Sequence, residues 1–372
     1  MNRNEKNSQR VMYLITSLDY GGAEVQVMNL ATKIKKANAV SIVSLIPPND
    51  NFLKKYNQSN ISIASLNMAR GKISIKSLHK AIKHIQHFKP SILHCHMVHA
   101  NILGRVVKIL YPHLKLISTA HNINEGGQVL MSLYKITNHL SSLNTNVSKR
   151  ATNRYLHEKI FPMYKTLFIP NGHEENILID KLEIKKEFSL DQSTFIWLAV
   201  GRFEIQKDYP NMILACKHVL SHYHQKQFCV LIAGEGNLKD PIAIMVKQEG
   251  LEDSIKILGN RTDIPRLMMG ADAFILSSEW EGLPMVLIEA CSARLPIVST
   301  RVGGVDEIVS DGINGFTCAP GDYVSLGERM VKMMISPQKK IDEFKKASYE
   351  IYKRHYMLKK IVDKWEHIYQ SL

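Results

Sequence analysis

The stretch DAFILSSEWEGLPMVLIE, residues 272–289, passes from a short apolar segment through a polar loop into an apolar helix start. An apolar run of this length followed by turn residues is typical of a strand in a parallel sheet. Pro284 suits the first turn of a helix, where its missing N–H costs no hydrogen bond. The order strand, loop and helix predicts one βα unit, with the loop at the carboxyl end of the strand.

Two carboxylates, Glu281 and Glu289, lie eight positions apart around the start of this helix. A helix N-terminus offers unpaired N–H groups and the positive end of the helix dipole, which favour phosphate oxygens. Carboxylates accept strong hydrogen bonds from sugar hydroxyls. The spacing therefore favours a nucleotide sugar whose diphosphate lies at the helix start. In a simpler alternative, Glu281 only stabilises the helix N-terminus and Glu289 is solvated.

Strand and helix patterns alternate along most of the chain. The sequence predicts strands at 11–18, 40–46, 92–96, 116–120, 195–200, 230–233, 255–258, 272–276 and 297–300, with helical patterns between them. This alternation indicates α/β architecture, with two doubly wound, Rossmann-like parallel-sheet domains facing a cleft. The pattern breaks at Ile169-Pro170-Asn171-Gly172. We therefore expect domains at 1–170 and 171–345, followed by a helical C-terminal extension, 346–372, that returns to the first domain.

Length and cysteine content limit the class of protein. A chain of 372 residues can bury two cores without disulfides, and its five cysteines are scattered, with no Cys-x-x-Cys pair. No apolar run approaches the roughly 20 residues of a membrane-spanning helix, and the segment 11–18 is too short for a secretion signal. We expect a cytoplasmic protein.

The net charge of +14 lies entirely in the first half of the chain. Residues 1–180 hold 23 lysines and arginines against 9 aspartates and glutamates, whereas residues 181–372 hold 25 of each kind. Such asymmetry indicates an anionic partner, which could be acidic lipid headgroups, a phosphorylated acceptor or nucleic acid, unless each basic cluster is only a solvated surface. Within the first half, Lys72, Lys76, Lys80 and Lys83 alternate with apolar residues in a basic amphipathic pattern. This helix either docks on an anionic membrane surface or packs on its own sheet with a solvated basic face.

Other candidate residues follow predicted strands. Arg202 and Lys207 come after 195–200, and two cations there suit a diphosphate, unless they only pair with surface carboxylates. The chain has no Asp-x-Asp to hold a divalent metal, so we expect neither a metal nor another cofactor. Further candidates, each also explicable as an ordinary turn or core residue, are Gly21 and Gly22, His121, Arg261, and the group His94, Cys95, His96 and His99, for which a metal site is the less favoured interpretation.

Together these motifs resemble the retaining glycosyltransferases of family 4, which have the GT-B fold. The resemblance covers nearly the whole chain and rests on five segments in the family's order. These are Gly21-Gly22, Ile169 to Gly172, Gly201-Arg202 with Lys207, Glu281 with Glu289, and the Gly-Gly-x-x-Glu-Ile-Val run at Gly303 to Val309.

The resemblance implies a role for each matched residue. Arg202 and Lys207 would bind the donor diphosphate, Glu289 the ribose and Glu281 the transferred sugar. The implied catalytic set is His121, Arg202, Lys207 and Glu281. The implied donor-binding set is Gly21, Gly22, Arg202, Lys207, Glu281, Gly282, Leu283, Pro284 and Glu289. Arg261 is added to it because its loop follows a predicted strand and could frame the base. The family transfers sugar from a nucleotide donor without a metal and keeps the anomeric configuration.

We therefore expect a transferase that moves a hexose or N-acetylhexosamine from a nucleotide sugar, a UDP-sugar first, to a glycan or polyprenyl-diphosphate-linked acceptor. This activity fits cell-surface polysaccharide biosynthesis, such as lipopolysaccharide or capsule, at the inner face of the cytoplasmic membrane. Alternatives are an epimerase or phosphorylase on a related fold. A nucleic-acid binder is disfavoured because no basic stretch interleaved with aromatic residues is present.

Overall fold

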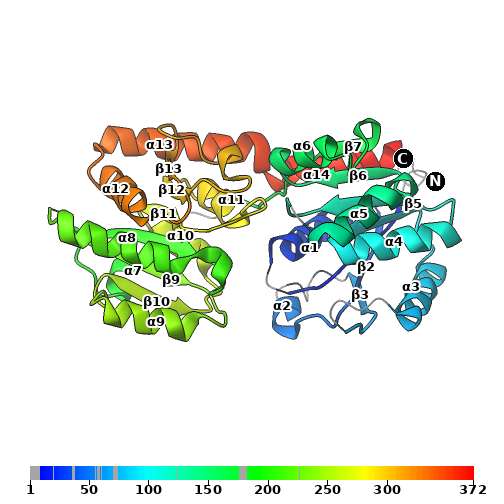
Figure 1. Cartoon of the computed structure of the whole chain (residues 1–372), viewed down its shortest axis with the longest axis horizontal. Coiled ribbons are helices and arrows are strands. Elements are labelled where there is room, and N and C mark those ends of the chain that lie inside the picture. The colour runs from blue at the N-terminus through cyan, green and yellow to red at the C-terminus, as the bar shows by residue number, and fades with distance from the viewer. Residues whose placement is uncertain are drawn as a thin grey trace. The chain divides into compact units, whose positions relative to one another are not determined.

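The chain folds into two compact units. The computed structural model (Figure 1) describes residues 9–19, 21–35, 38–54, 56, 59, 61–69, 74–123, 125–175, 182–225 and 227–372, except the side chains of 182 and 183. The first unit comprises the chain up to Gly172 together with Leu358–Leu372, and the second comprises His173–Met357.

The first unit is built on a parallel sheet of seven strands in the order β3-β2-β1-β4-β5-β6-β7. The strands are β1 (Arg10–Ile15), β2 (Ala39–Ser44), β3 (Ser62–Ser65), β4 (Ile92–His96), β5 (Lys115–Ala120), β6 (Leu143–Asn146) and β7 (Thr166–Phe168). The helices are α1 (Gly22–Ile34), α2 (Asp50–Lys54), α3 (Ile75–Phe88), α4 (Val98–Leu110), α5 (Gly127–Thr137), α6 (Lys149–His157) and α14 (Leu358–Ser371).

Side chains of β1 alternate between two hydrophobic cores, one on each face of this sheet. Val11, Tyr13 and Ile15 pack in the core that includes α1 and α14. Met12 and Leu14 pack in the core that includes α3 and α4. Because successive strand residues point to opposite faces, a strand covered by helices on both sides is apolar along its buried length, as residues 11–15 of β1 are.

The second unit has a parallel sheet of six strands in the order β10-β9-β8-β11-β12-β13. The strands are β8 (Phe195–Val200), β9 (Phe228–Ala233), β10 (Ile255–Gly259), β11 (Ala273–Leu276), β12 (Ile297–Thr300) and β13 (Gly315–Cys318). The helices are α7 (Leu182–Glu187), α8 (Tyr209–His222), α9 (Lys239–Gln248), α10 (Ile264–Gly270), α11 (Met285–Ser292), α12 (Tyr323–Met334) and α13 (Gln338–Ile351). The prediction of two doubly wound parallel sheets is confirmed.

The return to the first unit begins at Leu358, twelve residues after the predicted position 346. Side chains in the intervening segment are bonded within the second unit. Ser348 Oγ donates to the Leu295 carbonyl at 2.8 Å, and Tyr356 Oη donates to the Glu307 carbonyl at 2.9 Å. Because burying a hydroxyl without a partner is costly, these bonds hold the segment to the second unit.

The basic amphipathic segment forms α3. Its buried residues are Ser77, Ala81 and Ile85, while Lys76, Lys80 and Lys83 are exposed; Lys72 lies outside the described residues. The apolar face of α3 therefore packs on the core of its own domain. None of the helices in the described ranges is both long enough and apolar enough to cross a membrane.

Candidate active site

The predicted donor residues follow the two central strands of the second sheet. The strand order reverses between β8 and β11, and open α/β sheets bind ligands at the carboxyl ends of strands at such a reversal. The loop after β8 holds Arg202 and Lys207, and the loop after β11 holds Glu281. Helix α11 begins at Met285 and not at Pro284, which lies one residue earlier at the N-cap.

Lys207 and Glu281 form an ion pair across these two loops. Lys207 Nζ lies 2.6 Å from Glu281 Oε1, and the side chains are only 15% and 8% exposed. Ser278 Oγ donates to the same oxygen at 2.8 Å, and Gln206 Nε2 donates to Glu281 Oε2 at 3.2 Å. Three donors thus fix the orientation of one carboxylate. Neither Ser278 nor Gln206 was predicted, although Gln206 adjoins Lys207 and Ser278 lies three residues before Glu281.

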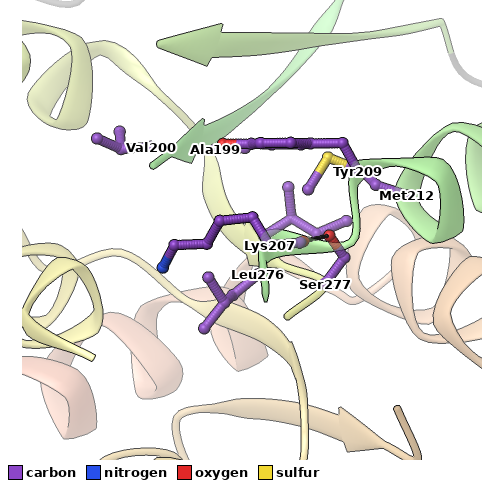
Figure 2. A pocket seen from close by; sticks show the side chains of 8 residues that line it. Ala199, Val200, Lys207, Tyr209, Met212, Leu276 and Ser277 are labelled. Carbon is purple, nitrogen blue, oxygen red and sulfur yellow. Dashed lines mark hydrogen bonds between the residues drawn. The ribbon is translucent and has the colours of Figure 1, made fainter. Parts of the chain in front are cut away.

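The stem of Lys207 lines a small cavity above the sheet (Figure 2). The cavity has a volume of about 10 Å³, and its lining includes Tyr209, Met212, Leu276 and Ser277. The Lys207 ammonium points away from Met212 and Ser277 in this view. Ser277 Oγ donates to the Lys207 carbonyl at 2.8 Å, so the residue directly after β11 also holds the backbone of the β8 loop.

A glycine pair after β12 supports the Glu281 loop. The Gly304 N–H donates to the Gly282 carbonyl at 2.7 Å. Gly303 has φ +54°, and a Cβ atom there would lie 2.1 Å from the Glu281 carbonyl oxygen. Only glycine permits this approach, because other residues need a Cβ and rarely adopt positive φ. Sequence analysis matched this pair to a motif without assigning it a contact.

The remaining predicted donor residues of the second unit differ in their surroundings. Arg202 is largely exposed, with Nη1 3.5 Å from Glu204 Oε1. Leu283 is buried, and Glu289 is half-buried in α11. Gly282 and Pro284 are also buried.

Arg261 is engaged by carboxylates. Its guanidinium donates to both oxygens of Asp263 at 2.8 Å and to Glu187 Oε1 at 2.9 Å. The hydrogen bonding to Asp263, followed by that to Glu187, raises the pKa of Arg261. The hydrogen bonding from Arg261 in turn lowers the pKa of Asp263. Since Glu187 ends α7, Arg261 ties the loop after β10 to that helix.

In the first unit, Gly21 and Gly22 lie where the β1 loop enters α1. Gly21 is the N-cap residue, and a Cβ atom there would lie 2.3 Å from Glu24 Oε2. Ser17 Oγ donates to Glu24 Oε1 at 2.7 Å. Glycine at this position therefore lets the Glu24 carboxylate fold back against the loop, a contact that sequence analysis did not predict.

His121 is buried directly after β5 and is held on two sides. Its Nε2 lies 2.9 Å from His96 Nδ1, and its backbone N–H donates to Glu125 Oε1 at 2.6 Å. Tyr134 Oη donates to the other Glu125 oxygen at 2.8 Å. Burial lowers the pKa of His121 to about 3 and raises the pKa of Glu125 to about 7. His121 is therefore a neutral hydrogen-bonding group at physiological pH.

His94 and His96 are core residues behind His121. His94 lies between Tyr369 Oη and Thr119 Oγ1, at 2.7 Å from each. Burial lowers the pKa of both His94 and His96 well below the ordinary value. Across the ranges that the structure describes, no three His, Cys, Asp or Glu side chains gather as a metal site would require.

The three neutral histidines predict acid lability of the first unit. In the unfolded chain each protonates near pH 6.5, whereas in the folded chain burial keeps it neutral, so stability is lost as pH falls below about 6.5. For His121 this loss continues down to its folded-state pKa of about 3. Each histidine should lower the free energy of unfolding by about 1.4 kcal/mol per pH unit. Glu125 acts oppositely, since its raised pKa costs stability as pH rises from 4.5 to about 7.

Urea unfolding of His96→Gln at pH 6.5 and pH 5 tests this account. The pH-dependent loss should be smaller than in the wild type by about 2 kcal/mol, the share of one histidine over this interval. His224→Gln, at an exposed position of the second unit, should keep the wild-type dependence. Equal dependence in His96→Gln and wild type would show that His96 is protonated in the folded protein.

Two family models together match most of the chain. The model described as "Glycosyltransferase Family 4" matches residues 20–176, and the model described as "Glycosyl transferases group 1" matches residues 180–351. The boundary between the two matches lies close to Gly172, where the structure divides the chain into two units.

Two of the similar proteins have names that specify an enzymatic activity. The N-acetyl-alpha-D-glucosaminyl L-malate synthase of Bacillus anthracis is 25% identical over 289 residues, covering 76% of this chain and 74% of that protein. The UDP-Gal:alpha-D-GlcNAc-diphosphoundecaprenol alpha-1,3-galactosyltransferase of Escherichia coli is 25% identical over 272 residues, or 70% of each chain. Among solved structures, Anabaena HepE in complex with UDP aligns with a TM-score of 0.85 at 19% identity, covering 97% of this chain and 100% of that one.

Proposed function

Because the chain belongs to glycosyltransferase family 4, we propose that it moves a hexose or N-acetylhexosamine from a UDP-sugar to a glycan or polyprenyl-diphosphate-linked acceptor, with the anomeric configuration retained. The observation that carries this proposal is the mostly buried Lys207–Glu281 pair at the reversal point of the GT-B second sheet. A cation and an oriented carboxylate there suit the two parts of a nucleotide sugar, the diphosphate and the hydroxyls.

The choice of UDP draws on the comparisons. Anabaena HepE, which shares the fold, was solved with UDP and with UDP-glucose. The E. coli relative is named for transfer from UDP-Gal to a diphosphoundecaprenol-linked sugar. These names support a UDP-sugar and a lipid-linked acceptor in cell-surface polysaccharide biosynthesis, at the inner face of the cytoplasmic membrane. The relatives are named as transferases and synthases, so an epimerase or phosphorylase is not favoured.

In the proposed reaction, Lys207 and Arg202 stabilise the leaving UDP. The bond from the anomeric carbon to the diphosphate oxygen breaks, and negative charge develops on that oxygen. The acceptor hydroxyl oxygen bonds to the same face of the sugar, and its proton passes to the departing diphosphate. Lys207 has three N–H donors, of which Glu281 accepts one. The cations and the N-terminus of α11 would oppose the developing charge without a metal.

The other residues would bind and orient. Glu281, fixed by Ser278 and Gln206, would accept hydrogen bonds from hydroxyls of the transferred sugar. Glu289 would accept hydrogen bonds from the ribose hydroxyls. His121, neutral because it is buried, would hydrogen-bond the sugar or the acceptor without adding charge. Arg261 has the least support as a donor residue, because Asp263 and Glu187 hold its guanidinium.

Thermal unfolding with nucleotides tests the donor proposal. UDP at 100 times its dissociation constant should stabilise the fold by about 2.7 kcal/mol and raise the melting temperature by several degrees. The rise should persist in EDTA and be lost in Arg202→Ala at the same UDP concentration. Arg354→Ala, at another exposed arginine of the second unit, should keep the rise. An unchanged melting temperature with UDP, GDP and their sugars would contradict a nucleotide-sugar site.

A further inference from the structure

We propose that the first unit docks on an anionic lipid bilayer through the outer face of α5 and the adjoining turn at Met163–Lys165. This inference deepens the proposed function, on which it rests for the lipid-linked acceptor, by naming the docking surface. We call the apolar residues of that face, Val129, Leu133 and Ile136, the α5 crest.

The α5 crest is an exposed apolar stripe. Val129, Leu133 and Ile136 are 74%, 39% and 69% exposed. Their spacing of four and three residues places them on one side of the helix. The buried residues of α5, Met131 and Tyr134, lie on the other side. A surface helix normally turns polar residues outward, so an outward apolar stripe indicates a surface that something covers.

The turn at Met163–Lys165 extends this apolar surface. Met163 and Tyr164 are 79% and 84% exposed. Lys165 Nζ donates to the Ser141 carbonyl at 2.8 Å and to the His139 carbonyl at 3.2 Å. Since Asn138–Leu140 directly follows α5, these bonds place the turn beside the end of that helix.

Helix α4 lies beside α5 (Figure 1) and also exposes apolar residues. Arg105 Nη1 donates to the Tyr134 carbonyl at 2.9 Å and to Thr137 Oγ1 at 2.8 Å, which ties α4 to the last turn of α5. Farther along α4, Ile109 and Leu110 are 60% and 53% exposed. Three neighbouring elements thus expose large apolar side chains.

The excess of basic residues in the segments around the α5 crest favours an anionic bilayer as the partner. Residues 98–168 hold 9 lysines and arginines against 2 glutamates. Of these, Arg105 and Glu125 are buried, and Glu158 is paired with Arg154 at 2.7 Å, which leaves seven basic residues and no acidic one. Apolar side chains amid basic ones are the pattern by which proteins insert shallowly into anionic membranes. A second copy of the same surface would bring like charges together, which disfavours a symmetric dimer through it.

Vesicle sedimentation tests the docking surface. The wild type should bind vesicles of equimolar phosphatidylglycerol and phosphatidylcholine and bind phosphatidylcholine vesicles weakly. The triple variant Val129→Ser, Leu133→Ser and Ile136→Ser should bind the anionic vesicles about tenfold more weakly or worse, because each removed side chain loses apolar burial. The control Ile244→Ser with Ile313→Ser removes exposed apolar residues of the second unit, 58% exposed each, and should bind as the wild type does.

Site-specific labelling gives an independent measurement. All five native cysteines are buried, so a single Ile136→Cys can carry an environment-sensitive dye, which should shift to the blue with anionic vesicles. The dye at Ile75→Cys, on α3 and 87% exposed, should not shift. A shift at Ile75→Cys alone, or wild-type vesicle binding by the folded triple variant, would overturn the proposal.

Two further outcomes are decisive. If the wild type is a dimer in solution and the triple variant is a monomer with unchanged vesicle binding, the α5 crest is a subunit interface and the proposal is wrong. The UDP-induced rise in melting temperature, measured on the same preparations, keeps the two proposals separable. If the triple variant loses vesicle binding but keeps the UDP-induced rise in melting temperature, the docking surface is supported. If UDP raises the melting temperature of neither protein, only the donor proposal is contradicted.

Discussion

Lys207→Ala should lower kcat by about 100-fold to 1,000-fold, the range for losing one preorganised group that stabilises developing negative charge. Its ammonium is the fixed cation nearest to Glu281, at 2.6 Å, among the contacts that the structure describes. The variant also leaves a carboxylate that is 8% exposed with only the neutral donors Ser278 and Gln206. Steady-state kinetics with a UDP-sugar should show a fall in kcat that exceeds any change in KM.

Lys217→Ala is the matched control for this prediction. Lys217 pairs with Glu249 between α8 and α9, and its side chain is 54% exposed. Exposed ion pairs contribute about 1 kcal/mol or less to stability, and this one lies outside the predicted site. The control should keep wild-type kcat. A folded Lys207→Ala with near-normal turnover would remove Lys207 from the catalytic set.

Gly303→Ala should impair both stability and catalysis. The new Cβ would lie 2.1 Å from the Glu281 carbonyl oxygen and 2.8 Å from that of Gly282. Both atoms belong to the backbone, so the loop that carries Glu281 must move. A displacement of about 1 Å can cost about 100-fold in rate. We expect kcat/KM to fall by that order and the free energy of unfolding to fall by about 3 kcal/mol, which combines backbone strain with overpacking.

Gly312→Ala separates strain from collision. Gly312 has φ +73°, but a Cβ atom there would meet nothing within 4 Å. This control carries the backbone strain alone, about 1 to 2 kcal/mol, and should keep wild-type kcat/KM. Kinetics should therefore show a large difference in kcat/KM between the two variants, whereas urea unfolding should show a much smaller difference in stability. Equal activity in both would show that the position of the Glu281 loop does not limit the reaction.

The strands that were predicted are those whose own residues are apolar. The predictions 92–96, 195–200 and 297–300 agree with β4, β8 and β12. Strand β6, Leu143–Asn146, was not predicted because asparagine usually marks turns. Asn144 and Asn146 are nonetheless fully buried. Contacts with residues distant in sequence accommodate them. For example, Arg105 Nη2 on α4 donates to Asn144 Oδ1 at 3.3 Å, and no local sequence pattern reveals this contact.

The candidate site divides in the same way. Motif spacing placed Lys207 and Glu281 in loops after strands. Their bond depends on β8 lying beside β11, a pairing of strands that are distant in sequence. Partners such as Ser278, Gln206 and Glu125 acquire their roles only once another side chain is in place. Ordinary polar residues of this kind carry no distinguishing signal in a single sequence.

The hydroxyl contact between Tyr13 and Tyr369, at 3.0 Å, joins residues 356 positions apart. During synthesis, β1 leaves the ribosome early, whereas α14 follows only after the whole second unit has been translated. Until then, the apolar face that receives Trp365 and Tyr369 lacks its covering helix. In the nascent chain this apolar face of the first unit is exposed to water or bound by a chaperone. The first unit therefore completes its fold only after the second unit has been synthesised.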